Sequence, residues 1–295
     1  MKDNVSQIEE MIYPYLPKEE GLQKRVLESM NYSFLAGGKR LRPMLMLETY
    51  KAFGGKQEEK IAPFMAALEM IHTYSLIHDD LPAMDNDDYR RGRLTNHKQF
   101  DEATAILAGD GLLNLAFETM LSAAASEKDY GLKCSMINAA FYMSRCSGVY
   151  GMIGGQMADI LGEGKKKLTK EELEFTYDNK TAKLLMAAMY VGAVLSQNAT
   201  PKELEQIEEI AKLTGRAFQV QDDILDKTST MEKLGKPIGS DDSNNKFTYI
   251  SLVGMEAAMK DQEEMTHRAL ALIDNLGCEA GVIKEIIEGL IKRTK

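Results

Sequence analysis

Two groups of carboxylates stand where apolar stretches of this sequence end. The first lies in SLIHDDLPAMDNDDYRRGR, residues 75–93, and the second in FQVQDDILD, residues 218–226. A solvated acidic surface is the simplest explanation, but apolar residues lead directly into both groups. Like charges held side by side repel one another, and a carboxylate buried without a partner is costly. A bound cation removes both difficulties, so the pattern predicts metal chemistry.

The second group has regular helical spacing. At about 100° per residue, Asp222 and Asp226 lie one turn apart on one helix face, and Gln219 shares that face. The residues between them are largely apolar, which predicts that these acids stand on a mostly buried helix.

The first group is less regular. Asp79 and Asp85 are six positions apart, which would place them about 120° apart on an unbroken helix. Pro82 ends or kinks that helix near Leu81, so Asp85 can fold back beside Asp79 on a turn. His72 lies two turns before Asp79 on the same face.

Oxygen ligands alone favour a hard cation, so the sequence predicts Mg²⁺ shared with substrate phosphates. An EF-hand is excluded, because DNDDYRRG (residues 85–92) lacks the alternating ligands and the glycine position of such a loop. The all-α HD phosphohydrolases are a nearer alternative, but His72 and the pair His78-Asp79 are too close to come from separate helices. Zinc is disfavoured because the chain has only four histidines and no paired cysteines.

Basic residues occur where a diphosphate would need them. The segment GGKRLRP, residues 37–43, starts with a double glycine that lets the backbone approach a ligand, but it is not a Walker loop. Each basic residue alone is more often a solvated charge, yet these lie beside the other polar interruptions of apolar helices. The candidates are Lys39, Arg40, Arg42, Arg90, Arg91, Lys180, Lys236 and Lys246.

Composition narrows the class of protein. The chain has 295 residues, of which 44% are hydrophobic, and its net charge of −9 argues against a nucleic-acid or anionic-membrane binder. Cys134, Cys146 and Cys278 form no CxxC pair and predict free thiols in a reducing cytosol. The N-terminal segment lacks the apolar core of a signal peptide, and residues 184–195 are shorter than the roughly 18 that cross a membrane. We therefore expect a cytoplasmic protein without stable membrane insertion.

Helix-forming residues dominate, and no sustained alternation predicts a strand. Thr169 with Glu172, and Thr200 with Pro201 and Glu203, predict helix starts. Since no linker or internal repeat separates two halves, the sequence predicts one all-α domain spanning residues 1–295. Its helices are expected at 4–14, 22–36, 42–53, 59–81, 100–124, 131–147, 149–161, 170–197, 202–227, 245–275 and 280–293.

With these residues in view, the chain resembles the short-chain trans-prenyl diphosphate synthases, and within them most closely the bacterial farnesyl diphosphate synthases. The resemblance implies an all-α bundle of the isoprenoid synthase type with a central active-site cavity, usually assembled as a homodimer. It covers nearly the whole length and rests on seven motifs in the family's order: GGKRLRP, YSLIHDDLPAMDNDDYRRG, AILAGDGLL, GGQMADI, NKTAKLL, FQVQDDILD and GKPIGSDDSNNK.

The resemblance also implies a role for each matching residue. The magnesium ions would be held by Asp79, Asp85 and Asp222, supported by Asp80, Asp223 and Asp226. The allylic diphosphate would be contacted by Arg90, Lys180, Gln219 and Lys236. The diphosphate of isopentenyl diphosphate would be bound by Lys39, Arg42, His72 and Arg91. The C-terminal IKRTK, residues 291–295, would close over that second substrate or form a solvated tail.

The implied chemistry agrees with the residues present. Magnesium and basic residues would stabilise the charge that develops on a departing diphosphate. The double bond of isopentenyl diphosphate would then attack the allylic cation, and the released diphosphate would take the proton. Thr181 and Gln219 would direct oxygen dipoles at the cation inside a dry cavity. With Lys180, these are the expected catalytic residues of a prenyltransferase that uses dimethylallyl or geranyl diphosphate and makes (2E,6E)-farnesyl diphosphate.

Other functions remain open at this point. A geranylgeranyl diphosphate synthase would share every motif. A class I terpene cyclase would need no second diphosphate site, so DDILD and the set of Lys39, Arg42 and His72 speak against it. A non-catalytic partner subunit tends to lose the aspartates, which are present here.

Product length is expected to depend on Tyr74. It lies five positions before Asp79, about 7.5 Å deeper along the helix. In the resembling family an aromatic residue at this position is typical of farnesyl synthases. Ser75 lies more directly below Asp79, and a core tyrosine satisfied by one hydrogen bond is the alternative.

Overall fold

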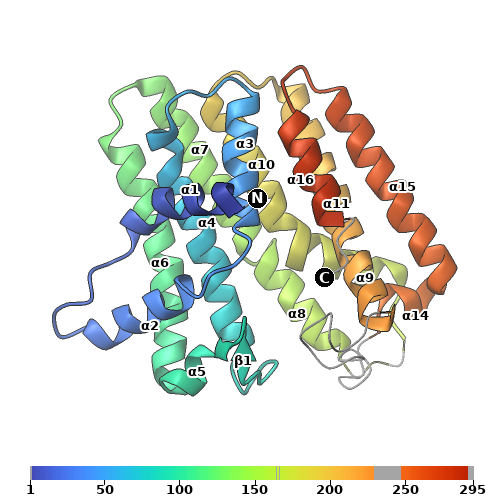
Figure 1. Ribbon diagram of the computed structural model, residues 1–295, viewed down its shortest axis with the longest axis horizontal. Coiled ribbons are helices and arrows are strands. Elements are labelled where there is room, and N and C mark those ends of the chain that lie inside the picture. Colours follow the sequence, from blue (N-terminus) through green and yellow to red (C-terminus); the bar gives the residue numbers. More distant parts are fainter. Residues whose placement is uncertain (1, 164, 166, 229–246, 292–295) are drawn as a thin grey trace.

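The computed structural model describes residues 2–163, 165, 167–228 and 247–291, and within these ranges the chain is almost entirely helical (Figure 1). The first half contains α1 (Lys2–Ile12), the 3₁₀ turn η1 (Tyr13–Tyr15), α2 (Lys24–Phe34), α3 (Leu41–Ala52), α4 (Glu58–Asp79), α5 (Asn96–Gln99), α6 (Glu102–Ser126) and α7 (Tyr130–Ser147). The second half contains α8 (Met152–Gly162), α9 (Lys170–Thr176), η2 (Tyr177–Ala182), α10 (Lys183–Ser196), α11 (Pro201–Thr228), α14 (Tyr249–Val253), α15 (Met255–Asp274) and α16 (Gly281–Ile291). The all-α prediction is confirmed.

One small β-hairpin was not predicted. Strands β1 (Tyr89–Arg90) and β2 (Arg93–Leu94) pair antiparallel directly after the first acidic group. Arg91 and Gly92 form its turn with φ angles of 53° and 76°, in the left-handed region that two-residue hairpins require. The sequence shows no alternation here because each strand has only two residues.

Two predicted helices are not continuous. The segment expected at 170–197 consists of α9, a π-helical stretch in η2, and α10. The segment expected at 245–275 breaks at Gly254, whose φ is 84°, so α14 and α15 are separate helices. The predicted helix starts are confirmed: Thr169 and Glu172 form a capping box, and Thr200 and Glu203 exchange hydrogen bonds at the start of α11.

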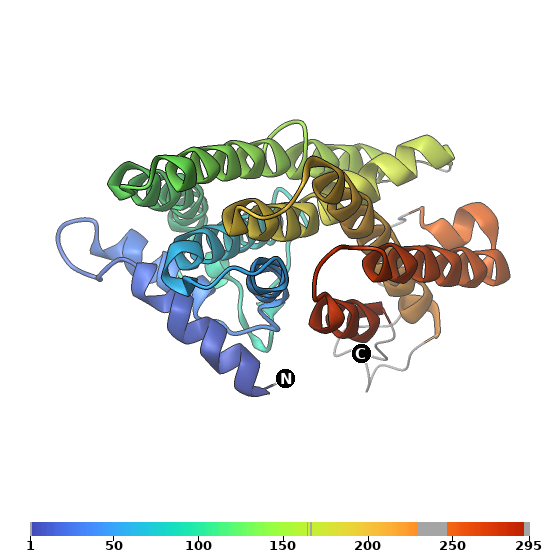
Figure 2. The same ribbon diagram turned by 90° about the horizontal axis from the view of Figure 1, so that it is seen from above.

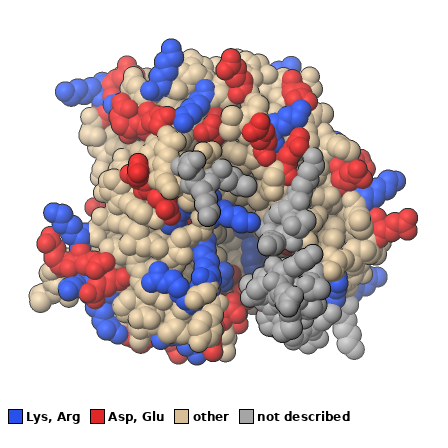
Figure 3. Space-filling model, in the orientation of Figure 1, with Lys and Arg blue, Asp and Glu red and all other residues tan. Residues whose placement is uncertain are grey.

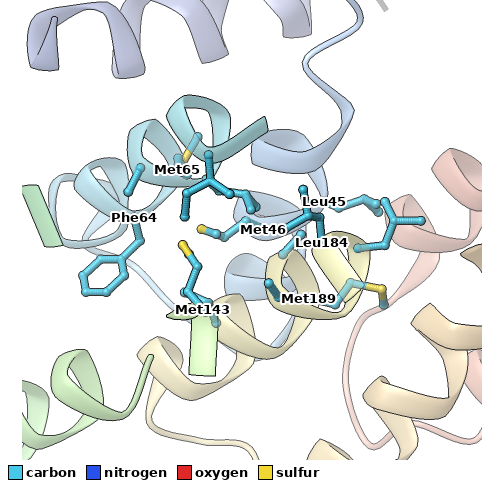
Figure 4. Close-up of a cluster of buried hydrophobic side chains, with 14 of the residues drawn as sticks. Leu45, Met46, Phe64, Met65, Met143, Leu184 and Met189 are labelled. Carbon is cyan, nitrogen blue, oxygen red and sulfur yellow. The ribbon is translucent and has the colours of Figure 1, made fainter. Parts of the chain in front are cut away.

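The main core lies between α3, α4, α7 and α10. Leu45, Met46, Phe64, Met65, Met143, Leu184 and Met189 come from these four helices and belong to one cluster of buried side chains (Figure 4). Gly192 lets α10 approach α3, since a methyl group there would lie 2.3 Å from the carbonyl oxygen of Met46. The apolar run at 184–195 is therefore a core helix, and among the described residues no helix combines the length and hydropathy needed to cross a bilayer.

A second, smaller apolar cluster supports the other end of the molecule. It joins α9, η2, α11, α14 and α15 through Leu168, Leu173, Tyr177, Val220, Ile224, Tyr249 and Ala258. Seen from above, α6, α7 and α8 form one outer side, with α1 and α16 on the opposite side (Figure 2). The arrangement of the chain as one domain over residues 1–295 stays a prediction.

Candidate active site

The first acidic group folds as its spacing predicts. Helix α4 ends at Asp79, and the chain turns through Pro82 so that the amide of Asp85 donates a hydrogen bond to the carbonyl oxygen of Asp79 at 2.9 Å. Met84 packs against the main core inside this turn. The prediction that Asp85 folds back beside Asp79 is confirmed, and both residues are brought to one short stretch of backbone.

Gln156 on α8 is a neighbour that the sequence analysis missed. Its side-chain amide donates a hydrogen bond to the Asp79 carboxylate. It belongs to the motif GGQMADI, in which Gly155 packs against η2: a methyl group on Gly155 would lie 2.1 Å from the backbone nitrogen of Lys180. The double glycine before Gln156 was the available signal in the sequence, because glycine allows another part of the protein to approach the backbone closely.

Asp80 and Arg90 form an ion pair at the edge of the site. The Arg90 guanidinium donates to both carboxylate oxygens of Asp80 at 2.5–2.8 Å, and Asp80 is buried. Burial raises the pKa of Asp80 while Arg90 opposes that rise. Asp80 therefore neutralises Arg90, and the expected contacts of Asp80 with metal and of Arg90 with diphosphate stay predictions.

Arg42, His72 and Arg91 form a basic cluster, in which both arginines act on the pKa of His72. Arg42 Nη1 lies 3.4 Å from His72 Nε2, and Arg42 Nε is buried without a hydrogen-bond partner in the described ranges. Burial lowers the pKa of Arg42 and of Arg91, with nearby arginines lowering both further and Glu69 opposing. Burial, followed by the charge of Arg42, lowers the pKa of His72 well below its ordinary value. The two desolvated arginines favour the binding of an anion, and His72 is a neutral imidazole beside them.

The glycine pair Gly37-Gly38 packs closely against Arg91. Arg91 donates a hydrogen bond to the carbonyl oxygen of Gly37, and a methyl group on Gly38 would lie 2.7 Å from Arg91 Nη1. Lys39, the next residue along the chain, is exposed. In Figure 3, Lys and Arg side chains gather around a hollow in the middle of the visible face.

Arg40 lies in the same motif but has a structural role. It is 2% exposed, has a left-handed φ of 46°, and pairs with Glu69 at 2.7 Å and Glu9 at 3.1 Å. Its guanidinium also donates to the carbonyl oxygen of Phe34 at 2.9 Å. These contacts fasten α1 and α4 to the start of α3. The guanidinium of Arg40, a candidate for diphosphate binding, is therefore already paired within the protein.

The three expected catalytic residues line one pocket. Lys180 and Thr181 come from η2 and Gln219 from α11, and the Thr181 hydroxyl donates to Gln219 Oε1 at 3.0 Å. Lys180 Nζ donates to Asp159 of α8 at 2.5 Å. Apolar residues complete the wall, among them Leu168, Leu173 and Phe247. Lys180 is the basic residue of this wall among the described residues, and Arg42, His72 and Arg91 do not line it.

The second acidic group contributes residues of two kinds. Asp222 and Asp226 are half-buried on α11, whereas Asp223 is buried and accepts hydrogen bonds from the Tyr177 hydroxyl and the Tyr249 amide. Within the described part of the chain, no three His, Cys, Asp or Glu residues are grouped closely enough to form a complete metal site on their own. Oxygen donors from two segments nevertheless suit a hard cation that takes further ligands from a substrate.

Tyr74 is buried in the core beside this site. It is 5% exposed, and its ring packs edge-on against His78 with ring centroids 5.8 Å apart. Burial raises the pKa of Tyr74 to about 12, and in the described residues its hydroxyl has no hydrogen-bond partner. A role in product length therefore stays a prediction. Lys236 and the C-terminal residues Lys292, Arg293 and Lys295 lie outside the described residues.

An all-α bundle that carries two acidic groups and two separate cationic sites matches the class that the sequence resembles. The chain belongs to the polyprenyl synthetase family, which matches residues 23–289. A farnesyl diphosphate synthase from Micrococcus luteus is 47% identical, over 95% of this chain and 93% of its own length. The farnesyl diphosphate synthase of Bacillus subtilis is 40% identical over 99% and 97%.

Solved structures agree with this assignment. A geranyltransferase from Helicobacter pylori, crystallised with magnesium and isoprenyl diphosphate, has a TM-score of 0.84 and 30% identity over 98% of this chain and 94% of its own. Plant relatives are also similar: a chloroplastic geranylgeranyl pyrophosphate synthase from Capsicum annuum is 45% identical over 82% of this chain but only 64% of its own length. The resemblance drawn from the seven motifs is confirmed.

Proposed function

We propose that this protein condenses isopentenyl diphosphate with an allylic diphosphate, dimethylallyl or geranyl, to give (2E,6E)-farnesyl diphosphate and diphosphate. The observation that carries the proposal is the separation of two cationic sites. Arg42, His72 and Arg91 form one, while Lys180 lines a different pocket. A reaction between two diphosphates needs two such sites, whereas a terpene cyclase needs one. The farnesyl diphosphate synthases among the relatives support the product.

The donor residues also fit Mg²⁺ as the cofactor. Asp79 and Asp85 are held together by the backbone hydrogen bond of their turn, and Asp222 stands half-buried on α11. Carboxylate oxygens are the ligands that this hard cation takes in proteins, together with substrate phosphates. When bound, magnesium supplies positive charge to a departing diphosphate. The similar geranyltransferase from Helicobacter pylori was crystallised with magnesium, which supports the choice of metal.

Each cationic residue then has one task. Lys180 holds the allylic diphosphate and stabilises its charge as it leaves. Arg42, His72 and Arg91 hold isopentenyl diphosphate, and Lys39 reaches it from the edge. The Lys180 ammonium is itself held by Asp159 at 2.5 Å, which fixes its position in the pocket.

The pocket wall protects and orients the allylic cation. The Thr181 hydroxyl donates its proton to Gln219 Oε1 at 3.0 Å, so its oxygen lone pairs remain available to face a positive charge. Leu168, Leu173 and Phe247 exclude water that would quench the cation. The proton lost after attack by the isopentenyl double bond goes to the released diphosphate, so the reaction needs no side-chain base.

We further propose that the protein works as a homodimer in the cytoplasm. One outer side, formed by α6, α7 and α8 (Figure 2), exposes large apolar residues that are each at least 42% accessible. They are Ile106, Leu107, Leu121, Ile137, Phe141, Ile153, Met157 and Leu161. A surface this rich in apolar residues is typical of a subunit interface. Light scattering of the wild type and of Phe141→Glu tests the proposal, and a wild type that is monomeric would contradict it.

The activity is tested by incubating the protein with geranyl diphosphate, isopentenyl diphosphate and Mg²⁺. Release of diphosphate and mass spectrometry of the product are measured, with a chelator control that is then restored by added Mg²⁺. We expect a fifteen-carbon product. A twenty-carbon main product would assign the protein to geranylgeranyl diphosphate synthesis, and diphosphate release from the allylic substrate alone would favour a cyclase.

A further inference from the structure

The contacts of Asp223 differ from the metal-supporting role that the motif implies for it. It is 5% exposed, whereas its neighbour Asp222 is half-buried. Asp223 Oδ2 accepts hydrogen bonds from the Tyr177 hydroxyl at 2.5 Å and from the Tyr249 backbone nitrogen at 2.9 Å. The Tyr249 amide also lies 3.2 Å from the Tyr177 hydroxyl oxygen. One carboxylate oxygen therefore joins η2, α11 and α14.

Two of these elements carry the residues of the allylic pocket, and Tyr177 and Asp223 lie in its wall as well. Lys180 and Thr181 lie on η2, and Gln219 lies one helical turn before Asp223 on α11. Tyr249 is the first residue of α14, and its hydroxyl donates to Asp261 of α15 at 2.7 Å. The contact is thus placed where a shift of any one element would change the pocket.

Tyr177 is the first residue of the π-helical segment Tyr177–Ala182. A π-helical turn contains more residues than an α-helical turn, occurs mostly as a single turn inside α-helices, and is frequent at functional sites. Relaxing it by one residue of register would rotate the residues that follow by about 100°. Lys180 and Thr181 would then no longer face Gln219 as they do here.

The surroundings of η2 leave little space for such a change. Gly155 of α8 packs against the backbone of Lys180, and a methyl group on Gly215 of α11 would lie 2.4 Å from the Ala182 Cβ atom. Asp178 is fixed by Arg216, whose Nη2 lies 2.7 Å from Asp178 Oδ2. At the start of the segment, the bond from Tyr177 to Asp223 completes this set of restraints.

We propose that Asp223 is a positioning residue. Its carboxylate oxygen holds Tyr177 and thereby the π-helical register that presents Lys180 and Thr181 to the allylic substrate, and the reaction does not use its negative charge. The inference rests on the proposed function, because it assigns Asp223 to the allylic half of that reaction.

Substitutions separate the hydrogen-bond acceptor from the charge. Asp223→Asn keeps an oxygen that accepts from Tyr177 and Tyr249 but removes the charge. Tyr177→Phe keeps the charge and the ring but removes the bond. Asp222→Asn is the matched control at the next position, where the charge is proposed to bind metal. We measure kcat and KM for both substrates, the affinity for inorganic pyrophosphate with Mg²⁺ by calorimetry, and the melting temperature without metal.

We expect Tyr177→Phe to lower kcat/KM for geranyl diphosphate roughly 10- to 100-fold, the usual cost of a hydrogen bond to a charged group, with little change in KM for isopentenyl diphosphate. Asp223→Asn should lose less than Tyr177→Phe and keep the wild-type affinity for magnesium pyrophosphate, which Asp222→Asn should lose. An Asp223→Asn protein as inactive and as weak in binding as Asp222→Asn would overturn the proposal, and so would a Tyr177→Phe protein with wild-type kinetics.

These measurements also distinguish the failure of this proposal from the failure of the proposed function. If the wild type does not join the two substrates, the proposed function is wrong. Pyrophosphate affinity and melting temperature then still decide whether Asp223 acts through its charge or through its bond. In that case a melting temperature lowered by Tyr177→Phe but not by Asp223→Asn supports the bond, and the reverse order overturns it.

Discussion

His72 provides a test of the basic cluster of Arg42, His72 and Arg91 that needs no turnover. Burial, together with Arg42 and Arg91, holds the pKa of His72 well below the ordinary value of 6.5, so the folded protein keeps this imidazole neutral. Below pH 6.5 the unfolded chain binds a proton at this position that the folded chain does not. Stability therefore falls as the pH falls from 6.5 toward the lowered pKa, and the full stability is present above 6.5.

The size of the effect follows from proton linkage. One proton changes stability by at most about 1.4 kcal/mol per pH unit, so lowering the pH from 6.5 to 5.5 costs up to about 1 kcal/mol. In a chain of this length that corresponds to a melting temperature lower by about 1.5–2 °C. His72→Asn removes the titrating group and keeps a neutral polar side chain.

The assay compares the two proteins by thermal unfolding at pH 7.5, 6.5 and 5.5. Because both contain the same carboxylates, the difference between them isolates His72. The wild type should lose up to about 1 kcal/mol more than His72→Asn between pH 6.5 and 5.5. A difference that does not change with pH would refute the reasoning. Bound inorganic pyrophosphate should reverse the sign of the pH dependence, because an anion beside His72 favours the protonated imidazolium. The affinity for pyrophosphate should therefore rise more on acidification in the wild type than in His72→Asn.

The remaining predictions concern catalysis and product length. Arg42→Ala should raise KM for isopentenyl diphosphate roughly 10- to 100-fold, with little effect on KM for geranyl diphosphate. Lys180→Ala should instead impair the reaction of the allylic substrate. Equal effects of either variant on both substrates would contradict the assignment of two binding sites. Asp79→Asn and Asp222→Asn should each lower turnover by at least roughly 100- to 1,000-fold while circular dichroism shows unchanged helix content, and near-normal activity of either variant would make its metal assignment wrong. Tyr74→Ala should let chains reach twenty carbons or more, because truncation opens apolar space beside the site. Chromatography of the dephosphorylated alcohols checks this. An unchanged fifteen-carbon product from a folded, active variant would show that another residue limits the chain length.

Local rules predicted the parts of the site that depend on local geometry. The proline at position 82 ends a helix wherever the rest of the chain lies, so the return of Asp85 to Asp79 could be read from the sequence. The spacing of Asp222 and Asp226 is likewise a property of one helix. The capping residues at the starts of α9 and α11 were identified for the same reason.

Partners from distant segments could not be predicted in this way. Arg40 and Arg42 are two positions apart in one basic motif, and the sequence gives both the same appearance. Arg40 is neutralised because Glu9 and Glu69 reach it from α1 and α4. The π-helical turn at Tyr177 was missed because the run that follows it, residues 184–195, is apolar on nearly every side and so reveals no change of register. Its restraints come from glycines on α8 and α11.

The distribution of these ion pairs explains how a protein with a net charge of −9 can be suited to bind diphosphates. Carboxylates pair with the arginines that hold the fold together: Glu69 with Arg40, and Asp80 with Arg90. Arg42 has no such pair among the described residues, and its pKa is lowered by burial. A buried guanidinium that the protein leaves short of negative charge destabilises the free protein, and a bound anion relieves that destabilisation. At Arg42, the affinity for a diphosphate therefore depends on which arginines the fold leaves without a carboxylate partner, and not on the overall charge of the chain.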